Sequence, residues 1–258
     1  MNNPDYLKVA MEAAESCRKT FSDNFGRPKQ VKFKNGNPKD FFTEVDLKLE
    51  KTISEKIRKA FPDHKIIGEE SNKDEVDKND LVWIIDPIDG TTNYIHGLPM
   101  CCISIALWSS KEPLVGVIYS PALDMLFTAK KGNGAYLNGQ RIRVSEQKNL
   151  SNAFGGFGWG RDEGAAAKNF PKLIKVVQKM RTLGSTALEM CFVAMGSYDF
   201  QFQAQIKIWD FAAAAIIVKE AGGKVTDHFG KSLNLTTTTT LTTNSKLHNQ
   251  FLPVLKKL

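Results

Sequence analysis

The chain has 258 residues, of which 42% are hydrophobic and 24% charged, and its formal net charge is +7. This amount of apolar material can bury a substantial core in one large domain or in two closely packed halves. The polar N-terminus lacks the apolar run of a signal peptide, and no apolar stretch is long enough to span a bilayer. Composition therefore argues against secretion and membrane insertion, and we expect a soluble, cytoplasmic protein.

The excess of positive charge fits a lysine-rich surface better than a nucleic-acid interface. The lysines are dispersed, with the densest group between Lys29 and Lys39, and the arginine-aromatic pattern of known nucleic-acid modules does not occur. We expect no nucleic-acid partner, although a positive surface would help to attract a phosphorylated substrate. The four cysteines show no Cys-x-x-Cys spacing, so we expect reduced, buried thiols.

The N-terminal part of the chain alternates between helix and strand patterns. Apolar residues near the 3.6-residue period predict helices over 4–25 and from about 43 to 62. Short apolar runs predict strands over 64–67 and 81–85. The basic segment 27–39 has the composition of an exposed, mobile loop.

The rest of the chain predicts a β-meander followed by helices and short strands. Asn138 and Gly139 give a hairpin signal at the end of the meander. We interpret the chain as a single domain with two intimately packed halves, roughly 1–145 and 146–258. The predicted strands are about 102–108, 113–119, 125–129, 134–137, 206–210 and 236–240, and the predicted helices are 163–180, 186–195, 211–221 and 246–258.

The segment 83–97 is the centre of the functional prediction, because an apolar strand runs directly into two acids, a glycine and a hydroxyl. Pro87 favours an extended conformation at Asp86, so we expect Asp86 to end the strand and face outward. Gly90 permits a sharp turn, and Thr91 is a good N-cap for a short helix near residue 92. Backbone N–H groups beside two carboxylates can bind phosphate only if divalent cations lie between them. The segment thus predicts a metal-dependent phosphate site.

Five acids lie at predicted ends or starts of elements, where an α/β scaffold presents functional groups. Taken singly, most have an ordinary structural explanation, such as a helix cap or a solvated turn. Oxygen ligands without clustered His and Cys favour magnesium, manganese or calcium over zinc. We choose magnesium, which can neutralise a phosphate monoester and lower the pKa of a bound water. The five acids are Asp46, Glu69, Asp86, Asp89 and Asp210.

Two rival chemistries are disfavoured by spacing. Phosphatases with an aspartyl nucleophile have acids two residues apart, whereas Asp86 and Asp89 are three apart, so different groups would converge on the phosphorus. The glycines of 155–160 lack the Gly-x-Gly-x-x-Gly spacing of a dinucleotide site, and no suitable acid follows. We therefore expect neither a phospho-aspartate nor a nucleotide cofactor.

Six short segments have the residues and the order of one known family. They are 43–46, 68–71, 86–97, 181–185, 209–213 and 220–223. Together they span nearly the whole chain, and they resemble the inositol monophosphatase family. The resemblance implies an α+β fold, a layered α-β-α-β-α sandwich of the sugar-phosphatase type with mixed, largely antiparallel sheets. It also implies two to three Mg²⁺ ions per site with Mn²⁺ as a substitute, inhibition by lithium, and a homodimer.

The same resemblance implies roles for individual residues. The first metal would be bound by Glu69, Asp86 and the Ile88 carbonyl, and the second by Asp86, Asp89 and Asp210. A water would be positioned by Glu69 and Thr91, with Asp46 close to Thr91, and Lys34 would match a lysine near a third, weaker metal. The residues implied in substrate binding are Asp89, Gly90, Thr91, Gly184, Ser185, Gln203 and Asp210, with the amides of Gly90 and Thr91 on phosphate oxygens.

Two departures from the family pattern concern substrate and packing. Gln203 stands where many members have a glutamate that contacts an inositol hydroxyl, and a neutral amide makes a weaker contact. Ala214 replaces a glycine within a predicted helix, where we expect an effect on packing only.

Our first functional hypothesis is a Mg²⁺-dependent phosphomonoesterase that hydrolyses inositol 1-phosphate by attack of a metal-activated water. The same chemistry on fructose 1,6-bisphosphate, histidinol phosphate, a 3′-phosphoadenosine phosphate or NADP is the alternative. An alternative of another class is a regulatory protein that binds RNA or the transcription apparatus. The intact set of acids argues against a purely binding role.

Overall fold

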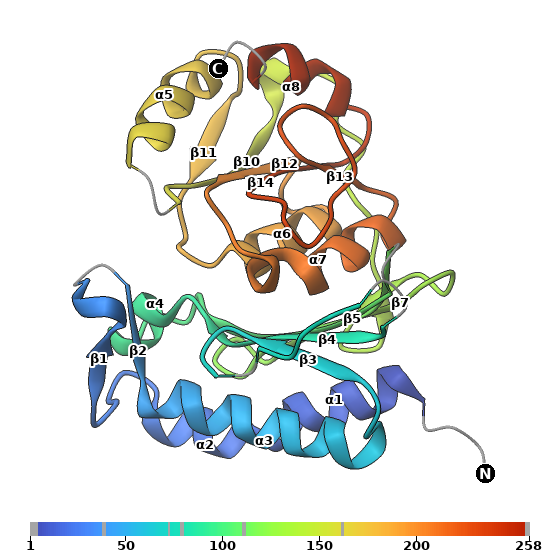
Figure 1. Cartoon of the computed structure of the whole chain (residues 1–258). Helices are drawn as coiled ribbons and strands as arrows, with labels where there is room; N and C mark the ends of the chain where they lie inside the picture. The colour runs from blue at the N-terminus through green and yellow to red at the C-terminus, as the bar shows by residue number, and fades with distance from the viewer. Residues whose placement is uncertain are drawn as a thin grey trace.

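The computed structural model describes residues 5–37, 40–71, 73–77, 80–109, 112–160 and 163–255. Helices and sheets alternate in α-β-α-β-α order, with α1, α2 and α3 on one outside and α5 and α8 on the other (Figure 1). This confirms the predicted α+β class. The helices are α1 (Tyr6–Ser16), α2 (Arg18–Asn24), α3 (Glu44–Ala60), α4 (Thr91–Ile95), α5 (Glu163–Ile174), α6 (Thr186–Ala194), α7 (Ile208–Glu220) and α8 (His248–Leu255).

The first sheet has seven strands in the order β3-β4-β5-β6-β7-β8-β9. Only β3 and β4 run parallel, and each later strand pairs antiparallel with the one before it, which confirms the predicted meander. Its last hairpin turns at Asn138 and Gly139, which both have positive φ angles, as predicted. The strands are β3 (Lys65–Gly68), β4 (Val82–Asp89), β5 (Cys102–Trp108), β6 (Pro113–Ser120), β7 (Met125–Lys130), β8 (Ala135–Leu137) and β9 (Gln140–Arg141).

The second sheet has five strands in the order β11-β10-β12-β14-β13, and a separate hairpin pairs β1 with β2. Its strand β10 runs parallel to both neighbours, whereas β14 runs antiparallel to both of its own. Both sheets are thus mixed, and the first is largely antiparallel. The strands are β10 (Phe154–Gly158), β11 (Lys179–Arg181), β12 (Phe200–Ala204), β13 (Lys224–Thr226), β14 (Thr239–Thr243), β1 (Val31–Phe33) and β2 (Phe41–Thr43).

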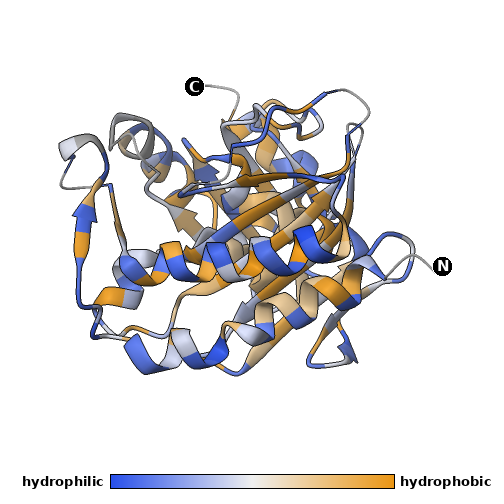
Figure 2. Cartoon of the chain, turned by 60° about the horizontal axis from the view of Figure 1, so that its bottom comes forward, coloured by the Kyte–Doolittle hydropathy of each residue, from blue (hydrophilic) through white to orange (hydrophobic). Residues whose placement is uncertain are grey.

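The outer helices are amphipathic, and their apolar sides face the first sheet. Hydrophobic and hydrophilic residues alternate along α1 and α3 in the view that brings these helices forward (Figure 2). Ala10 and Ala14 of α1 and Leu49, Ile53 and Ile57 of α3 are fully buried against that sheet. A 3.6-residue apolar stripe therefore produces one covered face and one solvated face.

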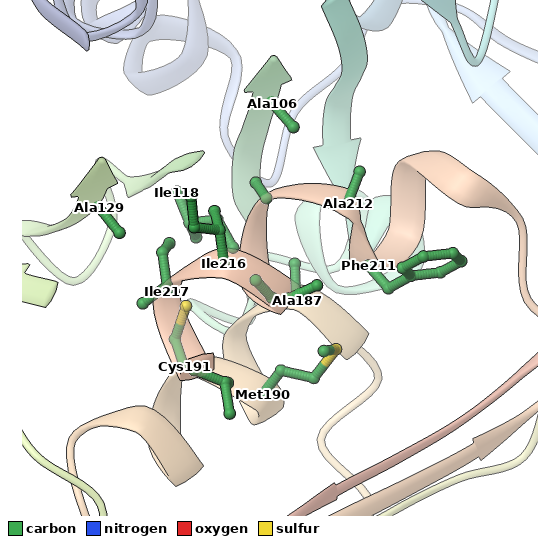
Figure 3. Packing of buried hydrophobic residues seen from close by; sticks show 14 of the residues in the cluster. Ala106, Ile118, Ala129, Ala187, Met190, Cys191, Phe211, Ala212, Ile216 and Ile217 are labelled. Carbon is green, nitrogen blue, oxygen red and sulfur yellow. The ribbon is translucent and has the colours of Figure 1, made fainter. Parts of the chain in front are cut away.

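The middle layer differs because α6 and α7 lie between two sheets and are apolar on nearly all sides. Ile216 and Ile217 of α7 pack with Ile118 of β6 and Cys191 of α6 in one cluster (Figure 3). Helix α7 approaches the sheet so closely that a side chain at Gly116 would overlap the Ala213 carbonyl oxygen. The inner layer thereby fixes the position of Asp210, which lies in the first turn of α7.

Strand β4 departs from the prediction at the most important point. We expected Asp86 to end the strand and face outward, but β4 continues to Asp89, and Asp86 is only 1% exposed. The pairing with β5 is regular up to Asp86 and resumes only at Asp89, with a register shift between them. Pro87 lies in this irregular segment, where its missing N–H costs no ladder hydrogen bond. The strand therefore continues past the proline instead of stopping before it.

Several other boundaries were wrong. The predicted helix 4–25 is two helices divided at Cys17, and 163–180 is helix only to Ile174, followed by β11. The predicted strand 206–210 is wrong, because α7 begins at Ile208, and short apolar runs do not distinguish a buried helix from a strand. The predicted strand 236–240 begins only at Thr239, since Asn234 first caps a turn.

The structure also tests the predicted helix starts, the strand near 64–67 and the state of the cysteines. Helices beginning at Thr43 and Ser185, and a strand near 64–67, are confirmed, and all four cysteines are free and buried. Lys39 and the last three residues of the predicted helix 246–258 lie outside the described residues. Within the described ranges no helix is long and apolar enough to cross a membrane.

Candidate active site

A cleft of about 450 Å³ lies where the ends of both sheets and the inner helices meet. The structure brings ten of the twelve sequence-predicted site residues to its wall. They are Glu69, Asp86, Ile88, Asp89, Gly90, Thr91, Gly184, Ser185, Gln203 and Asp210. The other two, Asp46 and Lys34, contact or approach this set from behind it.

The irregular end of β4 presents Asp86, Ile88 and Asp89 to the cleft. The Asp86 carboxylate accepts a hydrogen bond from the Ile88 amide at 3.0 Å, which holds the segment between the two acids in a tight turn. The Ile88 carbonyl oxygen accepts the Thr91 hydroxyl at 2.9 Å. Two carboxylates, a carbonyl and a hydroxyl thus converge within six residues of chain.

Gly90, not Thr91, caps helix α4, so the predicted N-cap is off by one residue. Gly90 has φ +87°, and a Cβ atom there would lie 2.8 Å from the Met100 carbonyl oxygen. Only glycine adopts this left-handed conformation in such close contact without strain. Thr91 is instead the first helical residue, and its hydroxyl turns back toward Ile88 rather than capping the helix.

Asp89, at the end of β4, is hydrogen-bonded to the start of helix α6. One of its oxygens accepts hydrogen bonds from the Ser185 hydroxyl at 2.5 Å and from the Ala187 amide at 2.8 Å. Ser185 also caps α6 through the Leu188 amide, as predicted. These bonds orient Asp89, and Ser185 contributes to the site by holding that carboxylate.

Lys34 lies in a short 3-10 turn after β1, and its ammonium contacts Glu69 at 2.9 Å and Glu70 at 2.7 Å. The segment 27–39 was predicted to be a mobile loop without regular structure. Its described part instead contains β1, which pairs with β2, and the 3-10 turn that carries Lys34. Burial alone lowers the pKa of Lys34, but the two carboxylates outweigh it and raise that pKa above its ordinary value. Lys34 therefore remains an ammonium at the edge of the acidic cluster.

Asp46 starts helix α3 and is buried behind the cleft. It accepts hydrogen bonds from the amide and hydroxyl of Thr43, at 2.8 and 2.6 Å, in a reciprocal capping box. This is the ordinary structural role. Burial, and secondarily the charge of Glu69, raises the pKa of Asp46 to about 6.

Asp210 occupies the third position of α7 and accepts the Lys207 amide at 2.7 Å. A helix cap was the structural alternative to a functional role for Asp210, and the structure confirms that Asp210 caps α7. The same side chain also lines the cleft, half-buried. The two roles are compatible, because the two oxygens of an ionised carboxylate can together accept several ligands.

Glu50 is the main residue that sequence reasoning missed. It is fully buried on α3, and its oxygens accept the amides of Glu70 and Ser71 at 2.8 and 2.9 Å and the Ser71 hydroxyl at 2.6 Å. A side chain at Gly68 would collide with this carboxylate. The available signal was the spacing of four residues between Asp46, Glu50 and Ser54, which marks a polar stripe beside the apolar one.

Asn93 and Glu189 were also missed, and both organise the loop that carries Gly184. The Asn93 amide donates to the carbonyl oxygens of Met100 and Leu183, at 2.7 and 2.6 Å. The Glu189 carboxylate accepts the Leu183 amide at 2.9 Å and lines the cleft, and burial raises its pKa to about 8. No sequence pattern marked Glu189, because it lies within an apolar helix.

The acids of the cleft are poorly compensated. Burial first, and repulsion from Glu69, Asp89, Asp210 and Asp46 second, raises the pKa of Asp86 well above its ordinary value. Burial, partly offset by Ser185 and Ala187, likewise raises the pKa of Asp89 to about 6. Such shifts mean that the folded chain holds negative charge at a high electrostatic cost, which a divalent cation would relieve.

The donor set fits magnesium rather than a metal held entirely by protein. Among the described residues, no group of three or more His, Cys, Asp and Glu side chains is already arranged as a metal cage. Mg²⁺ retains several waters and is usually bound by one or two carboxylates together with substrate phosphate. A cleft with separate carboxylates and the Ile88 carbonyl suits that mode of binding.

The layered fold and the acidic cleft between its sheets define a protein of the sugar-phosphatase type. Residues 2–258 match the inositol monophosphatase family, and the chain belongs to that family. It is 38% identical to inositol monophosphatase 2 of Solanum lycopersicum, over 98% of each chain. It is 37% identical to a fructose-1,6-bisphosphatase/inositol-1-monophosphatase of Aquifex aeolicus, over 99% of this chain and 97% of the relative. The solved structure of an IMPase from Thermotoga maritima superposes with a TM-score of 0.90, at 37% identity and 98% coverage of both chains.

Replacing Glu50 by glutamine tests its role as the anchor of the 68–71 loop. The amide leaves only one accepting oxygen for the three donors, so we expect a loss of about 1–3 kcal/mol in the free energy of unfolding. Urea denaturation measures this loss. Glu55→Gln, at an exposed position of the same helix, is the matched control and should change stability by less than about 0.5 kcal/mol. Equal effects of the two substitutions would contradict the anchoring role.

The raised carboxyl pKa values predict how Mg²⁺ stabilisation depends on pH. Asp46, Asp89 and Glu70, with pKa values raised to about 6, 6 and 7, bind more protons folded than unfolded, so their contribution to stability falls as the pH rises through that range. Mg²⁺ binds the deprotonated site, so the increment in unfolding free energy that it adds should increase from pH 5 to pH 8. Thermal unfolding with and without Mg²⁺ measures the increment.

The measured quantity is the difference between the unfolding free energies with and without Mg²⁺. The contributions of groups remote from the site cancel in this difference. His248, whose pKa burial lowers to about 4, makes the whole protein less stable as the pH falls, which is the opposite trend. An increment that stays constant or shrinks toward pH 8 would contradict metal binding by the deprotonated acids of the cleft.

Proposed function

We propose that the chain is a Mg²⁺-dependent phosphomonoesterase that hydrolyses inositol 1-phosphate or a similar small polyol phosphate. The observation that carries this proposal is the buried, mutually repelling pair Asp86 and Asp89 beside Glu69 and Asp210 in one cleft. Family membership supports the same reaction class. Fructose 1,6-bisphosphate is the second candidate substrate, because the Aquifex relative is named for both activities.

We propose two metal positions, as the family resemblance implies, and the donors in the cleft support them. Glu69, Asp86 and the Ile88 carbonyl would hold one Mg²⁺, and Asp86, Asp89 and Asp210 would hold another, with Mn²⁺ as a substitute. The bound ions would supply Lewis-acid neutralisation of the phosphate and would lower the pKa of the attacking water. Asp86 would be shared between the two positions, and it is more deeply buried than Asp89, at 1% against 8% exposed.

The chain's own groups orient the reactants. Thr91 donates its hydroxyl hydrogen to Ile88, so its oxygen lone pairs remain to accept a hydrogen bond from a water. We assign Glu69 to the same water and the amides of Gly90 and Thr91 to phosphate oxygens. We propose that Asp46 acts on Glu69 and Thr91 indirectly. It is buried behind the cleft and fixes the start of α3 by accepting the Thr43 amide.

We propose that the leaving alcohol lies beside Gln203, which lines the cleft from β12 and is 6% exposed. Gly184 and Ser185 also line the cleft, and we propose that they contact the substrate from the side of Gly90, where a Cβ atom would lie 3.3 Å from the Gly184 carbonyl oxygen. A side chain at Gly158 would overlap the Gln203 amide oxygen, so the glycine makes room for the amide. We propose that this amide hydrogen-bonds a substrate hydroxyl. We also propose a homodimer, a cytoplasmic location and sensitivity to lithium, as the family resemblance implies, and we expect no nucleic-acid partner.

Asp86→Asn tests the reaction most directly. An amide neutralises the shared ligand, and we expect kcat/KM on myo-inositol 1-phosphate with Mg²⁺ to fall at least about 100-fold. Asp124→Asn, at an exposed turn, is the control and should keep full activity. Unchanged hydrolysis in the Asp86 variant, or in wild-type protein with EDTA, would refute the metal mechanism. RNA binding with steep salt dependence and no turnover on any phosphomonoester would instead favour the regulatory alternative.

Gln203→Glu tests the substrate assignment. A charged acceptor makes a stronger hydrogen bond to a hydroxyl than a neutral amide does, so the variant should hydrolyse inositol 1-phosphate with a KM several-fold lower. Steady-state kinetics on a panel of polyol, sugar and nucleotide phosphates measures the change. A KM for inositol 1-phosphate that does not fall would show that Gln203 does not contact this alcohol.

A further inference from the structure

Gln205, the residue directly after β12, has a left-handed backbone conformation. Its φ angle is +56°, the residue is exposed, and it lines the active-site cleft. Crowding around Cβ makes this conformation unfavourable for most residues, and glycine, asparagine and aspartate adopt it most readily. Strained residues of this kind persist where the surrounding structure holds them, and they concentrate at functional sites.

The other residues with this conformation lie elsewhere. Within the described ranges, the non-glycine residues with positive φ are Gln205, Asp124, Asn138 and Ser245, and of these only Gln205 lines the cleft. Asp124 and Asn138 are of the residue types that tolerate the conformation, and the Ser245 hydroxyl donates to the Gly222 carbonyl oxygen at 2.8 Å. A long side chain held in a strained conformation at the cleft is therefore particular to Gln205 in the described part of the chain.

The neighbouring strand β10 leaves room for side chains from β12. A Cβ atom at Gly158 would overlap the Gln203 amide, and one at Gly160 would lie 2.1 Å from the Ala204 carbonyl oxygen. Between these glycines, Trp159 stacks its ring on a phenylalanine of α5. The amide groups of this part of the cleft wall thus come from β12 and from the residue that follows it.

Gln203 and Gln205 give the wall two neutral amides, two residues apart in the chain. Each amide has one accepting oxygen and two donating hydrogens, whereas a hydroxyl group both donates and accepts. Two neighbouring hydroxyls of a polyol can therefore each pair with one amide, and no charge has to be compensated. A phosphate ester whose alcohol has no further hydroxyl would gain nothing from Gln205.

We propose that Gln205 is a specificity residue, whose amide hydrogen-bonds a hydroxyl of the leaving alcohol next to the hydroxyl that contacts Gln203. This assignment rests on the proposed phosphomonoesterase function and leaves its reaction unchanged. Gln205 contacts the alcohol and not the reacting atoms. The strained backbone is kept because it holds the amide at the cleft wall.

The first test compares a polyol ester with an ester that lacks hydroxyls. With Mg²⁺, myo-inositol 1-phosphate and p-nitrophenyl phosphate are assayed with wild type, Gln205→Ala, Gln205→Gly and the control Asp124→Gly, which alters a left-handed residue outside the cleft. We expect both Gln205 variants to lose about three- to tenfold in kcat/KM on the inositol ester, mainly through KM, and less than about twofold on the aryl ester. Asp124→Gly should keep both activities.

Two kinetic results would overturn the assignment. An equal loss on both esters would mean that Gln205 supports the cleft wall without contacting the alcohol. An unchanged KM for the inositol ester in both variants would mean that the amide makes no contact with the substrate.

Thermal unfolding of the same variants separates the amide from the backbone. Gln205→Ala and Gln205→Gly both remove the amide, but only glycine relieves the left-handed strain, so Gln205→Gly should unfold about 2 °C or more above Gln205→Ala. The two variants should nonetheless have the same kinetics. Equal unfolding temperatures would remove the strain on which the inference rests, and normal inositol phosphatase activity in Gln205→Gly alone would assign the effect to the backbone.

A binding measurement distinguishes failure of this inference from failure of the proposed function. Saturation-transfer NMR detects weak binding of myo-inositol alone, and the signal should be strong with wild type and Asp124→Gly and weaker with Gln205→Ala. If wild type hydrolyses no phosphomonoester but binding of myo-inositol still depends on Gln205, the proposed function fails and the role of Gln205 stands. If Asp86-dependent hydrolysis is found and wild type and Gln205→Ala give equal signals, the function stands and the role of Gln205 is refuted.

Discussion

The structure depends on one electrostatic constraint, the confinement of several carboxylates in a place with little water. Asp86 is fully buried, Asp89 nearly so, and Glu69 and Asp210 add charge at the same cleft. In a medium of low polarity, buried like charges cost several kcal/mol unless they are protonated or paired with a cation. A chain that folds with such a cluster would be stabilised by a divalent ion that binds there, which would couple stability to the ligand that the proposed reaction uses.

Hydrogen bonds from the surrounding elements keep these carboxylates in place despite their mutual repulsion. Two of these acids depend on hydrogen bonds from other elements: Ser185 at the start of α6 donates to Asp89, and Glu50 of α3 accepts the amides of Glu70 and Ser71 next to Glu69. These bonds join elements distant in sequence, so neither sheet could form the site alone. Asp210 is held within its own helix, where it accepts the Lys207 amide. Gln203, which we propose contacts the alcohol, comes from β12, an element that carries none of the proposed metal ligands, so substrate choice could vary while those ligands stay in place.

Sequence analysis predicted the fold class and the residues of the cleft well, because short motifs such as 86–93 carry both the strand end and the ligands. It failed where tertiary contacts decide. A proline next to Asp86 predicted the end of a strand, but the register shift against β5 allows the strand to pass it. Glu50 is one of many charged residues of α3, and the sequence does not set it apart from the exposed ones. Its burial comes from a tertiary contact, the close approach of Gly68 and of the loop that follows it.

Crystals grown with Mn²⁺ and inorganic phosphate, and measured for anomalous scattering of manganese, test the central claim most directly. The account predicts manganese peaks in the cleft that share Asp86 as a ligand, one toward Glu69 and the Ile88 carbonyl and one toward Asp89 and Asp210, with phosphate beside Gly90. A cleft without anomalous peaks at saturating Mn²⁺, in which the carboxyl groups are hydrogen-bonded to one another, would contradict the account.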